Sequence, residues 1–421
     1  MLDMIRTFAD AHRVLHSFYN IPGTNTYTLD RMQALMEYLG NPQDKLCIVH
    51  VAGTSGKTST SYYVAGLLCA TGASVGLTVS PHVDEVNERV QINGIPLPEV
   101  VFCKDLNDFI DVVHDSGITP SYFELLTAFA YWEFARQGLD YAVMEVGLGG
   151  LLDATNVVSR KDKVCVITDL GLDHVDILGK TLPEITKQKA GIITEGNHVF
   201  IHKQDLEVMH VIEEVCRQNS AVLHTYSSDK DDFLAELRLP LFQQRNMHLA
   251  IQVAAYVLDR DKQSKLTREQ IRGVASIQVP ARMEIFKLVG KTLIIDGSHN
   301  SQKLRALTNS ISSEFHNQSI YALVAFVSGD DQRWQTGLDV LMYLVDGLIV
   351  TSFTSNQDFP KQSVDPDKIV EYCHKQGFTN LVVEKEPEKA FGLLTKQSQD
   401  LLLVTGSFYL LNHIRPLIKV I

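Results

Sequence analysis

The stretch KLCIVHVAGTSGKT, residues 45–58, decides the fold of this chain. Its first half is an apolar run typical of a strand that is covered on both faces, and glycines interrupt the run before a helix begins. A strand, a glycine turn and then a helix form the context that a phosphate-binding loop requires. The sequence therefore predicts a sheet whose first strand ends at a nucleotide phosphate site.

The residue types of this loop fit a nucleoside triphosphate. The candidate ligands are Gly53, Thr54, Ser55, Gly56, Lys57 and Thr58. Glycines let backbone N–H groups approach phosphate oxygens, Lys57 is expected to reach the terminal phosphates, and the Thr58 hydroxyl is expected to reach Mg²⁺. Val51 stands where the full GxxxxGK[ST] pattern has its first glycine, so a glycine turn before an ordinary helix stays the alternative. The pattern favours ATP or GTP and leaves the reaction open.

Apolar runs rich in Val, Ile and Leu recur along the chain and alternate with amphipathic stretches. They predict strands at 45–51, 141–146, 164–170, 198–202, 292–298, 319–327, 347–353, 380–385 and 401–407. The predicted class is α/β, with an N-terminal P-loop-type, doubly wound, mostly parallel sheet domain and a smaller C-terminal Rossmann-like α/β domain. Pro280 interrupts the stretch IQVPARMEI, which puts the predicted domains at 1–279 and 280–421.

Composition and charge exclude several classes of protein. A formal net charge of −12 argues against broad nucleic-acid binding, although a local cluster of amides and cations can still bind a small anion. The sequence contains no run of about 18 apolar residues, so it predicts no membrane span. Its N-terminus does not resemble a signal peptide. The six cysteines form no CxxC pair, which favours reduced thiols. We therefore expect a cytoplasmic monomer that binds small molecules, and neither nucleic acid nor a membrane.

Acidic side chains follow several predicted strands. Glu145 ends the strand 141–146, at the edge where parallel sheets bind ligands, and its carboxylate suits Mg²⁺. The glycines after it lack the full spacing of a dinucleotide fingerprint, which remains a minor alternative. Asp173 and His174 follow the next strand, where a structural turn and a site are equally favoured. Asp296 ends a strand of the second domain and is a candidate to hold a ribose or adenine group.

Two further residues are ordinary structural groups when they are considered alone. Lys189 falls on a predicted helix, where a solvated surface lysine is the expected interpretation. Glu124 lies in the apolar helix SYFELLTAFAYW, where a capping or solvent-facing role is preferred. The residues themselves assign neither of them to a site.

Nine ordered segments, spread over nearly the whole chain, resemble the Mur ligase superfamily, and within it the folylpolyglutamate synthase/dihydrofolate synthase family. The first five are HVAGTSGKTS (50–59), SPHVDEVNERVQING (80–94), SYFELLTAFAYW (121–132), EVGLGGLLDATN (145–156) and LDHVDILGKTLPEITKQKAGII (172–193). The others are QQRNMHLA (243–250), PARMEIF (280–286), DGSHN (296–300) and LLVTGSFYL (402–410).

The resemblance implies an ATP-dependent ligase that adds L-glutamate to a folate or to dihydropteroate. The acceptor carboxylate would take the γ-phosphoryl group of ATP, and the glutamate amine would then attack the acyl-phosphate. Two Mg²⁺ ions are implied, which Thr58, Ser80, Glu145, His174 and a carbamylated Lys189 would hold. The implied catalytic set is Lys57, Glu145, His174 and Lys189.

The resemblance also implies two sets of binding residues. Those for ATP beyond the phosphate loop are Asn246, Arg282, Asp296 and His299. Those for the pterin ring of a folate are Ser121, Tyr122, Phe123, Glu124, Leu152, Asp153 and Ala154. Closure of the second domain would bring Arg282 and Asp296 onto the nucleotide and exclude water.

The chain departs from the family pattern at several positions. Thr58-Ser59 follows the loop lysine where the folate enzymes usually have Gly-Ser, Leu151 replaces a polar or basic residue, Gln188 replaces an acid, and Ser301 replaces a proline. Two alternatives therefore stay open. One is a Mur-type ligase that joins an amino acid to a non-folate carboxylate. The other is a nucleotide-binding protein that has lost ligation.

Overall fold

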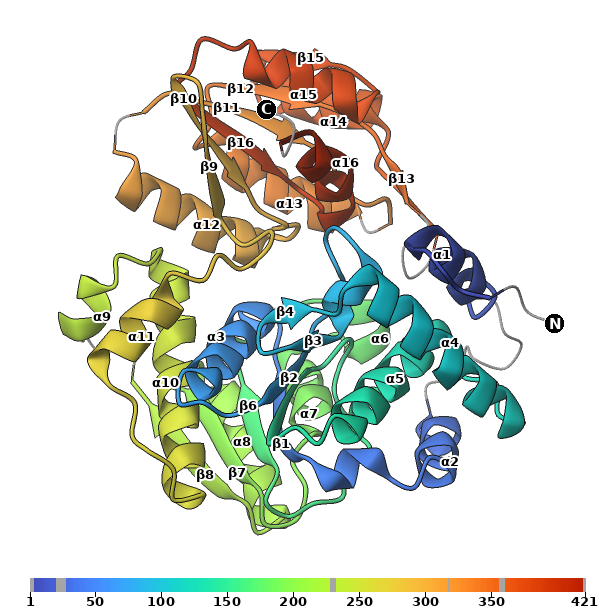
Figure 1. The fold of residues 1–421 in the computed structure, drawn as a ribbon. Coiled ribbons are helices and arrows are strands. Elements are labelled where there is room, and N and C mark those ends of the chain that lie inside the picture. The colour runs from blue at the N-terminus through green and yellow to red at the C-terminus, as the bar shows by residue number, and fades with distance from the viewer. Residues whose placement is uncertain are drawn as a thin grey trace. The chain divides into compact units, whose positions relative to one another are not determined.

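The computed structural model describes residues 4–19, 28–227, 232–316, 318–329, 331–355 and 360–418. The chain divides into two compact units, and each contains its own sheet (Figure 1). The first unit is Met1–Leu239 with Gln243–Ile277, and the second is Pro240–Phe242 with Gln278–Ile421. The division into domains at 1–279 and 280–421 stays a prediction.

The first unit contains an eight-stranded sheet, within the described residues, in the order β4-β3-β2-β5-β1-β6-β7-β8. Its strands are β1 (Cys47–Ala52), β2 (Val75–Thr78), β3 (Gln91–Ile92), β4 (Ile95–Pro96), β5 (Tyr141–Glu145), β6 (Val164–Ile167), β7 (His198–His202) and β8 (Val222–Tyr226). Strands β2, β5, β1, β6, β7 and β8 are parallel, and β3 and β4 are added antiparallel at one edge.

Helices cover both faces of this sheet (Figure 1). They are α1 (Phe8–His16), α2 (Asp30–Tyr38), α3 (Lys57–Cys69), α4 (Glu99–Asp115), α5 (Tyr122–Arg136), α6 (Val175–Leu178), α7 (Leu182–Ala190), α8 (Leu206–Gln218), α9 (Asp232–Glu236), α10 (Leu241–Arg260) and α11 (Arg268–Ala275), with the 3-10 turns η1 (Pro42–Lys45) and η2 (Val86–Arg89). Ile48, Ala142 and Met144 pack in one core with α1, α2, α4 and α5. Helices α7 and α8 cover Cys165 and Ile167.

Strand β1 therefore presents two different faces to the helices. Successive side chains of a strand point to opposite sides of the sheet. Ile48 lies in the core with α5, so His50 points to that side as well, while Val51 points to the side where α3 packs. Val51 pairs with Glu145 on β5, which puts the Glu145 carboxylate on the α3 side.

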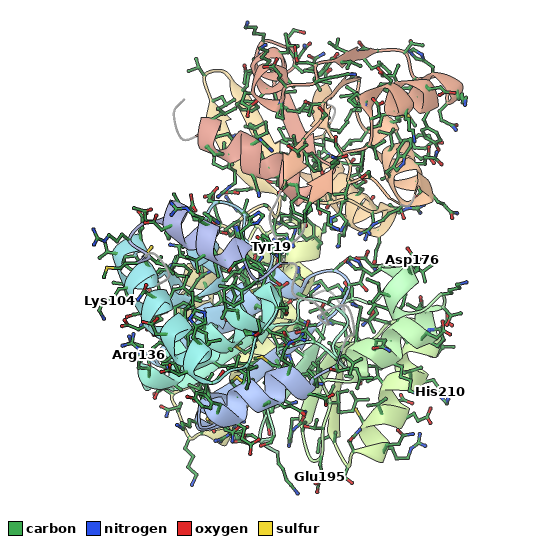
Figure 2. The ribbon with its side chains drawn as sticks, turned by 90° about the vertical axis from the view of Figure 1, so that its right-hand side faces the viewer. Tyr19, Lys104, Arg136, Asp176, Glu195 and His210 are labelled. Atoms are coloured by element: carbon green, nitrogen blue, oxygen red, sulfur yellow. The ribbon has the colours of Figure 1, made fainter. Side chains whose placement is uncertain are left out.

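The flank of the first unit is held by an ion-pair cluster between α4 and α5. Arg136 at the end of α5 lies 2.6 Å from the Asp105 carboxylate and 2.7 Å from that of Glu133, which is fully buried. Lys104 and Arg136 lie on the same flank, away from Asp176 (Figure 2). The cluster anchors the C-terminal end of α5. The N-terminal end of the same helix carries several residues that are predicted to bind the pterin ring.

The second unit contains a six-stranded sheet in the order β15-β12-β11-β16-β10-β9, within the described residues. Its strands are β9 (Glu284–Leu288), β10 (Lys291–Ile295), β11 (Ile320–Val324), β12 (Gly347–Val350), β15 (Leu381–Val383) and β16 (Leu401–Thr405), and a separate ladder joins β13 (Thr354–Ser355) to β14 (Lys361–Gln362). All pairs of the sheet are parallel except β9 with β10.

Helices also cover the second sheet. They are α12 (Ser301–Glu314), α13 (Asp331–Met342), α14 (Pro366–Lys375), α15 (Pro387–Thr395) and α16 (Phe408–Ile418). The main core of this unit joins α12, α13 and α14 to the sheet through residues such as Leu304, Leu338 and Ile369. Helices α15 and α16 pack together and contact β11, β12 and β16.

The predicted α/β class is confirmed, and every predicted strand coincides with a strand of the structure. The sequence interpretation missed β2, β8, β9 and the short ladders. Strand β2 is a four-residue segment containing Gly76, β8 is a half-exposed edge, and β9 is an antiparallel edge with a half-exposed pattern. Edge strands carry weak apolar runs because only part of their surface is covered, so run length alone does not find them.

The structure also bears on membrane-spanning helices and on the state of the cysteines. In the part of the chain that the structure describes, no helix is long and apolar enough to cross a membrane. All six cysteines lie among the described residues, and each is a free thiol.

Candidate active site

The turn between β1 and α3 is built so tightly that only glycine fits at two positions. A Cβ atom on Gly53 would lie 1.8 Å from the Thr168 hydroxyl oxygen. Gly56 has a φ of 90°, and a Cβ there would lie 2.4 Å from Oδ1 of Asn246 on α10. Because glycine tolerates positive φ and close approach, the turn brings its backbone to the start of α3. Asn246 therefore lies directly against the predicted phosphate loop.

The loop rests on the segment that follows β6. The backbone N–H groups of Thr54 and Ser55 donate to the Asp169 carbonyl oxygen at 2.9 and 3.0 Å. The Asp169 carboxylate pairs with Arg245 on α10, with a shortest distance of 2.8 Å. The His202 ring donates from Nε2 to the Arg245 carbonyl at 3.1 Å. The first N–H groups of α3 have no acceptor within that helix, so its N-terminus suits phosphate oxygens.

Two lysines converge on one carbonyl oxygen of the loop. Lys57 Nζ lies 3.1 Å from the Gly53 oxygen, and Lys189 Nζ lies 2.9 Å from the same atom. Lys189 comes from α7 and is only 4 % exposed. The interpretation of Lys189 as a solvated surface lysine is therefore wrong. A helix pattern does not reveal that the neighbouring loop folds over this side chain.

Oxygen donors gather beside this loop around Glu145. Its carboxylate is 2 % exposed, accepts a hydrogen bond from the Thr58 hydroxyl at 2.9 Å, and lies 3.4 Å from the backbone nitrogen of Ser80. No group of three or more His, Cys, Asp and Glu side chains among the described residues is arranged to hold a metal. Mg²⁺ on a nucleotide needs only one or two carboxylates beside phosphates and water, so the donors present fit it.

Asp173 and His174 form the turn that follows β6. The His174 backbone has a φ of 50° and its N–H donates to the Asp173 carboxylate at 3.1 Å. The Asp173 side chain is 5 % exposed, whereas that of His174 is 44 % exposed. The structural-turn interpretation therefore accounts for Asp173. The assignment of His174 as a metal ligand stays a prediction.

The N-terminus of α5 carries four of the predicted pterin residues. Ser121 and Glu124 form a reciprocal capping box, so the capping role expected for Glu124 is confirmed. Glu124 also accepts two hydrogen bonds from Arg31, at 2.7 and 2.9 Å. Tyr122 is buried, and its ring lies 4.6 Å from that of Tyr19. The carboxylate of Glu124 therefore has a structural role at this end of the helix.

The ring of Phe123 packs directly on the backbone that leaves β5. A Cβ atom on Gly147 would lie 2.4 Å from the end of that ring. A Cβ on Gly150 would lie within 2.9–3.0 Å of the carbonyl oxygens of Gln188 and Lys189. The loop after Glu145 is thus packed against both α5 and the end of α7.

The same loop presents apolar side chains outward and a carboxylate inward. Leu151 and Leu152 are 40 % and 42 % exposed, whereas Asp153 and Ala154 are buried. The Asp153 carboxylate accepts from the backbone N–H of Leu148 at 2.7 Å and from the backbone and hydroxyl of Thr155. Burial raises the pKa of Asp153 despite these donors. Its carboxylate organises the loop, and its contact with a pterin stays a prediction.

The predicted ATP residues of the second unit form a cluster of their own. Arg282 stands between two residues with positive φ, and its guanidinium lies 4.3 Å from the centre of the Phe408 ring. Asp296, 2 % exposed, accepts from the backbone N–H of Met283 at 2.7 Å and of Ser298 at 2.8 Å. Burial raises the pKa of Asp296, and the Arg282 charge opposes that rise. The Asp296 carboxylate thus fixes the strained turn that carries Arg282.

His299 belongs to the same cluster. Its Nδ1 donates to the Gly297 carbonyl at 2.9 Å, which leaves Nε2 to accept from Lys303 Nζ at 3.1 Å. A Cβ on Gly297 would lie 2.7 Å from the Phe408 ring. The segments DGSHN and TGSFYL therefore meet in the folded second unit. Phe408 was not among the predicted site residues, although its segment LLVTGSFYL was one of the nine that carried the family resemblance.

Sequence reasoning also missed supporting residues in the first unit. Asp169 lay inside a predicted strand, which ends at Ile167 in the structure. Arg245 stood within a quoted segment, but its partner lies 76 positions away and no local pattern connects them. Long-range pairs of this kind become visible only when the strands are placed side by side.

Two family models match this chain. Residues 51–259 match the Mur ligase middle domain, and residues 281–408 match the Mur ligase, glutamate ligase domain. The phosphate loop, Glu145 and Lys189 lie in the first matched region, and Arg282, Asp296 and Phe408 lie in the second. The fold and the site therefore define a ligase of the Mur class.

Individual relatives narrow this class. Dihydrofolate synthetase of Saccharomyces cerevisiae is 30% identical over 415 residues, which cover 92% of this chain and 96% of that protein. The structure of Mycobacterium tuberculosis folylpolyglutamate synthase complexed with ADP matches with a TM-score of 0.85 and 26% identity over 99% of both chains. An E. coli relative in complex with DHPP and ADP matches with a TM-score of 0.83 and 26% identity over 98% of both chains. The chain belongs to the dihydrofolate synthase/folylpolyglutamate synthase family.

Proposed function

We propose that this protein is an ATP-dependent ligase that adds L-glutamate to a folate, to dihydropteroate, or to both. The observation that carries the proposal is the phosphate loop with Lys57, Thr58 and Glu145 at its edge, in a chain of this family. The relatives bind ADP, and one of them binds DHPP as well. A reaction that uses a carboxylate acceptor, ATP and glutamate suits a chain that matches both the Mur ligase middle domain and the glutamate ligase domain.

The reaction has two steps that conserve atoms and charge. A carboxylate oxygen of the acceptor attacks the γ-phosphorus of ATP, and ADP leaves. The glutamate amine then attacks the acyl carbon of the acyl-phosphate, and phosphate leaves as the amine loses a proton. Lys57 neutralises charge on the transferring phosphoryl group, and the α3 N-terminus binds the phosphate oxygens. Glu145, which is buried beside the Thr58 hydroxyl, would offer its carboxylate to a metal ion on the nucleotide.

Mg²⁺ would be held by the Thr58 hydroxyl, Ser80 and Glu145, with a second ion near Glu145, His174 and Lys189. When bound, the ions would stabilise negative charge on the phosphates. The oxygen donors around Glu145 support the first of these sites.

We also propose that Lys189 is carbamylated. The Lys189 amine is buried and lies 2.9 Å from the Gly53 oxygen of the phosphate loop, a place where an anionic oxygen donor would suit a metal ion on the nucleotide. A neutral amine attacks CO₂, forms a carbamate and releases a proton, and the product is an anionic oxygen donor. Protein prepared with ¹³C-bicarbonate should show a carbamate carbon signal that Lys189→Arg lacks. A wild-type spectrum without that signal would contradict the modification.

The nucleotide contacts of Asn246, Arg282, Asp296 and His299 are proposed as well. The contact of Asn246 with Gly56 supports its part. The buried Asp296 and the Arg282–Phe408 contact support a preformed turn in the second unit. Cytoplasmic localisation, a monomeric state and two domains divided at 279/280 remain proposals.

Purified protein with ATP, Mg²⁺ and L-glutamate tests the function directly. Dihydropteroate and tetrahydrofolate are supplied in separate reactions, and the products are analysed by mass spectrometry. We expect a product heavier by one glutamyl residue with at least one acceptor, together with ADP and phosphate. Absence of a glutamylated product with every folate supplied would overturn the substrate assignment.

A Mur-type ligase for another carboxylate is the second candidate. The observation that favours it is the exposed Leu151, an apolar side chain where many folate enzymes have a polar or basic one. A panel of aromatic and aliphatic carboxylates, assayed for glutamate-dependent phosphate release, separates the two candidates. Release with a non-folate acid at lower KM than with any folate would favour the second.

A further inference from the structure

A buried chain of hydrogen bonds joins β1 to the loop that follows β5. His50 on β1 is fully buried, and its Nε2 lies 2.8 Å from the hydroxyl oxygen of Thr155. The Thr155 hydroxyl in turn donates to Oδ1 of Asp153. All three side chains are at most 5 % exposed. The chain therefore runs through the interior without contact with solvent.

The carboxylate at the end of this series of hydrogen bonds determines which groups donate and which accept. The Asp153 carboxylate only accepts, so the Thr155 hydroxyl uses its one proton there and must accept from His50. His50 is thereby held as the tautomer with hydrogen on Nε2. Burial and the charge of the fully buried Lys163 lower the pKa of His50 well below its usual value. The ring is neutral in the folded protein at neutral pH.

The sheet register puts Lys163 and His50 on the same face of the sheet. His50 pairs with Cys165 on β6, and Lys163 lies two residues before Cys165, so the three side chains share one face. The Lys163 amine and Nδ1 of His50 each lack a hydrogen-bond partner among the described residues. Burial lowers the pKa of Lys163. The relay thus begins at His50, beside a buried amine that is not hydrogen-bonded to it, and ends at the buried Asp153 carboxylate.

The far end of the relay fastens a turn. Oδ2 of Asp153 accepts from the Leu148 backbone N–H at 2.7 Å, which closes the segment 148–153 into a compact loop. The Tyr131 hydroxyl on α5 donates to the Thr155 carbonyl at 2.8 Å and holds the other side. Leu152, 42 % exposed, is displayed by this loop. The orientation of Leu152 therefore depends on Asp153, and that of Asp153 on Thr155 and His50.

We propose that His50 is a positioning residue for the aromatic acceptor, acting through Thr155 to hold Asp153 and the 148–153 loop in their binding conformation. The inference rests on the proposed function, since it takes the acceptor to be a pterin-type aromatic carboxylate. His50 lies on β1, the strand that leads into the phosphate loop, and its side chain points to the α5 side of the sheet. Glu145 and Thr58 lie on the α3 side. The relay should therefore affect the acceptor and leave the nucleotide site intact.

The test compares substitutions that keep or remove a donor at the Nε2 position. His50→Gln places an amide N–H close to that position, whereas His50→Leu fills the space without a donor. Losing one buried hydrogen bond should raise the acceptor KM roughly tenfold in His50→Leu. The KM for ATP should stay within about twofold of wild type in both variants, and His50→Gln should recover most of the loss.

Thr155 supplies a matched pair at the next position of the relay. Thr155→Val keeps the shape and removes the hydroxyl, and Thr155→Ser keeps the hydroxyl. The first should raise the acceptor KM and the second should stay close to wild type. The double variant His50→Leu/Thr155→Val should cost little more than either change alone, because both break one chain. If His50→Leu does not fold, the Thr155 pair and His50→Gln decide the question.

The outcomes separate this inference from the proposed function. Wild-type protein that glutamylates no folate would overturn the proposed function and the inference with it. Wild-type protein that ligates a folate, with an unchanged acceptor KM in His50→Leu and Thr155→Val, would overturn the inference alone. An equal rise in the KM values for ATP and acceptor would also overturn it, because that pattern indicates general loss of structure.

Discussion

The two sides of strand β1 carry different chemistry only one residue apart. On the α3 side, Val51 neighbours Glu145, whose carboxylate meets the Thr58 hydroxyl. On the α5 side, His50 begins the relay to Thr155 and the loop after β5. One side gathers charge and oxygen donors for phosphate, and the other orders a loop with exposed apolar side chains. The alternation of a single strand thus separates the phosphate-loop side from the relay side, and both sides lie at one edge of the sheet.

Because of this difference, we expect substitutions on the two sides of β1 to change different kinetic constants. Loss of a group on the phosphate side removes stabilisation of the transferring charge and lowers kcat. Loss of a group on the relay side misplaces the acceptor and raises its KM.

Glu145→Gln should have the largest effect. The amide oxygen still accepts from Thr58, so the local fold is kept, but the negative charge that suits Mg²⁺ is lost. We expect kcat to fall by on the order of 10² or more, because metal loss removes several kcal/mol of charge stabilisation. Steady-state kinetics at saturating acceptor measures this. Glu236→Gln, a change in an exposed ion pair, is the control. Equal kcat values for Glu145→Gln and wild type would remove Glu145 from the mechanism.

Arg245→Ala should have an intermediate effect on the phosphate side alone. Arg245 pairs with Asp169, whose carbonyl oxygen accepts from two N–H groups of the phosphate loop. Both side chains are partly exposed, so we expect only a roughly threefold to tenfold rise in the KM for ATP. The acceptor KM should not change.

Arg272→Ala is the matched control for this substitution, because its partner Glu236 and Arg272 itself are both about half exposed. A double-mutant cycle of Arg245→Ala with Asp169→Asn should show coupling in the KM for ATP. Additive effects would mean that the pair does not support the loop.

His202→Gln should have the smallest effect, visible in the pH dependence of stability. Burial and the nearby Arg245 lower the pKa of His202 to about 4. Between pH 6.5 and pH 4, approximately, His202 is protonated in the unfolded chain and neutral in the folded chain. The free energy of unfolding therefore decreases as the pH is lowered through this range. Glutamine keeps the donor to the Arg245 carbonyl and does not titrate.

The variant should therefore lose less stability than wild type on acidification, by up to ~1.4 kcal/mol per pH unit. Urea unfolding at several pH values between 7 and 5 measures the difference. His210→Gln, at an exposed position of α8, is the control for the loss of a histidine (Figure 2). Identical slopes for wild type and His202→Gln would contradict the burial argument.

The sequence predicted the α/β class and the strands with continuous apolar runs, because such runs mark parallel strands covered on both faces. It did not predict β8 or β9, whose exposed faces dilute the apolar pattern. The phosphate loop was predicted because Gly53 to Thr58 are adjacent in sequence. The burial of Lys189, the Asp169–Arg245 pair and the His50–Thr155 relay join distant segments, and their residue types carry no local signal.

The central claim is that an acceptor carboxylate attacks the γ-phosphorus of ATP at the edge of β1 and β5. Acceptor labelled with ¹⁸O in its carboxylate, supplied with ATP, Mg²⁺ and L-glutamate, tests this claim directly through the mass of the released phosphate. We expect one ¹⁸O atom to pass from the carboxylate to phosphate in each turnover. Phosphate without ¹⁸O, or release of AMP and pyrophosphate, would contradict it.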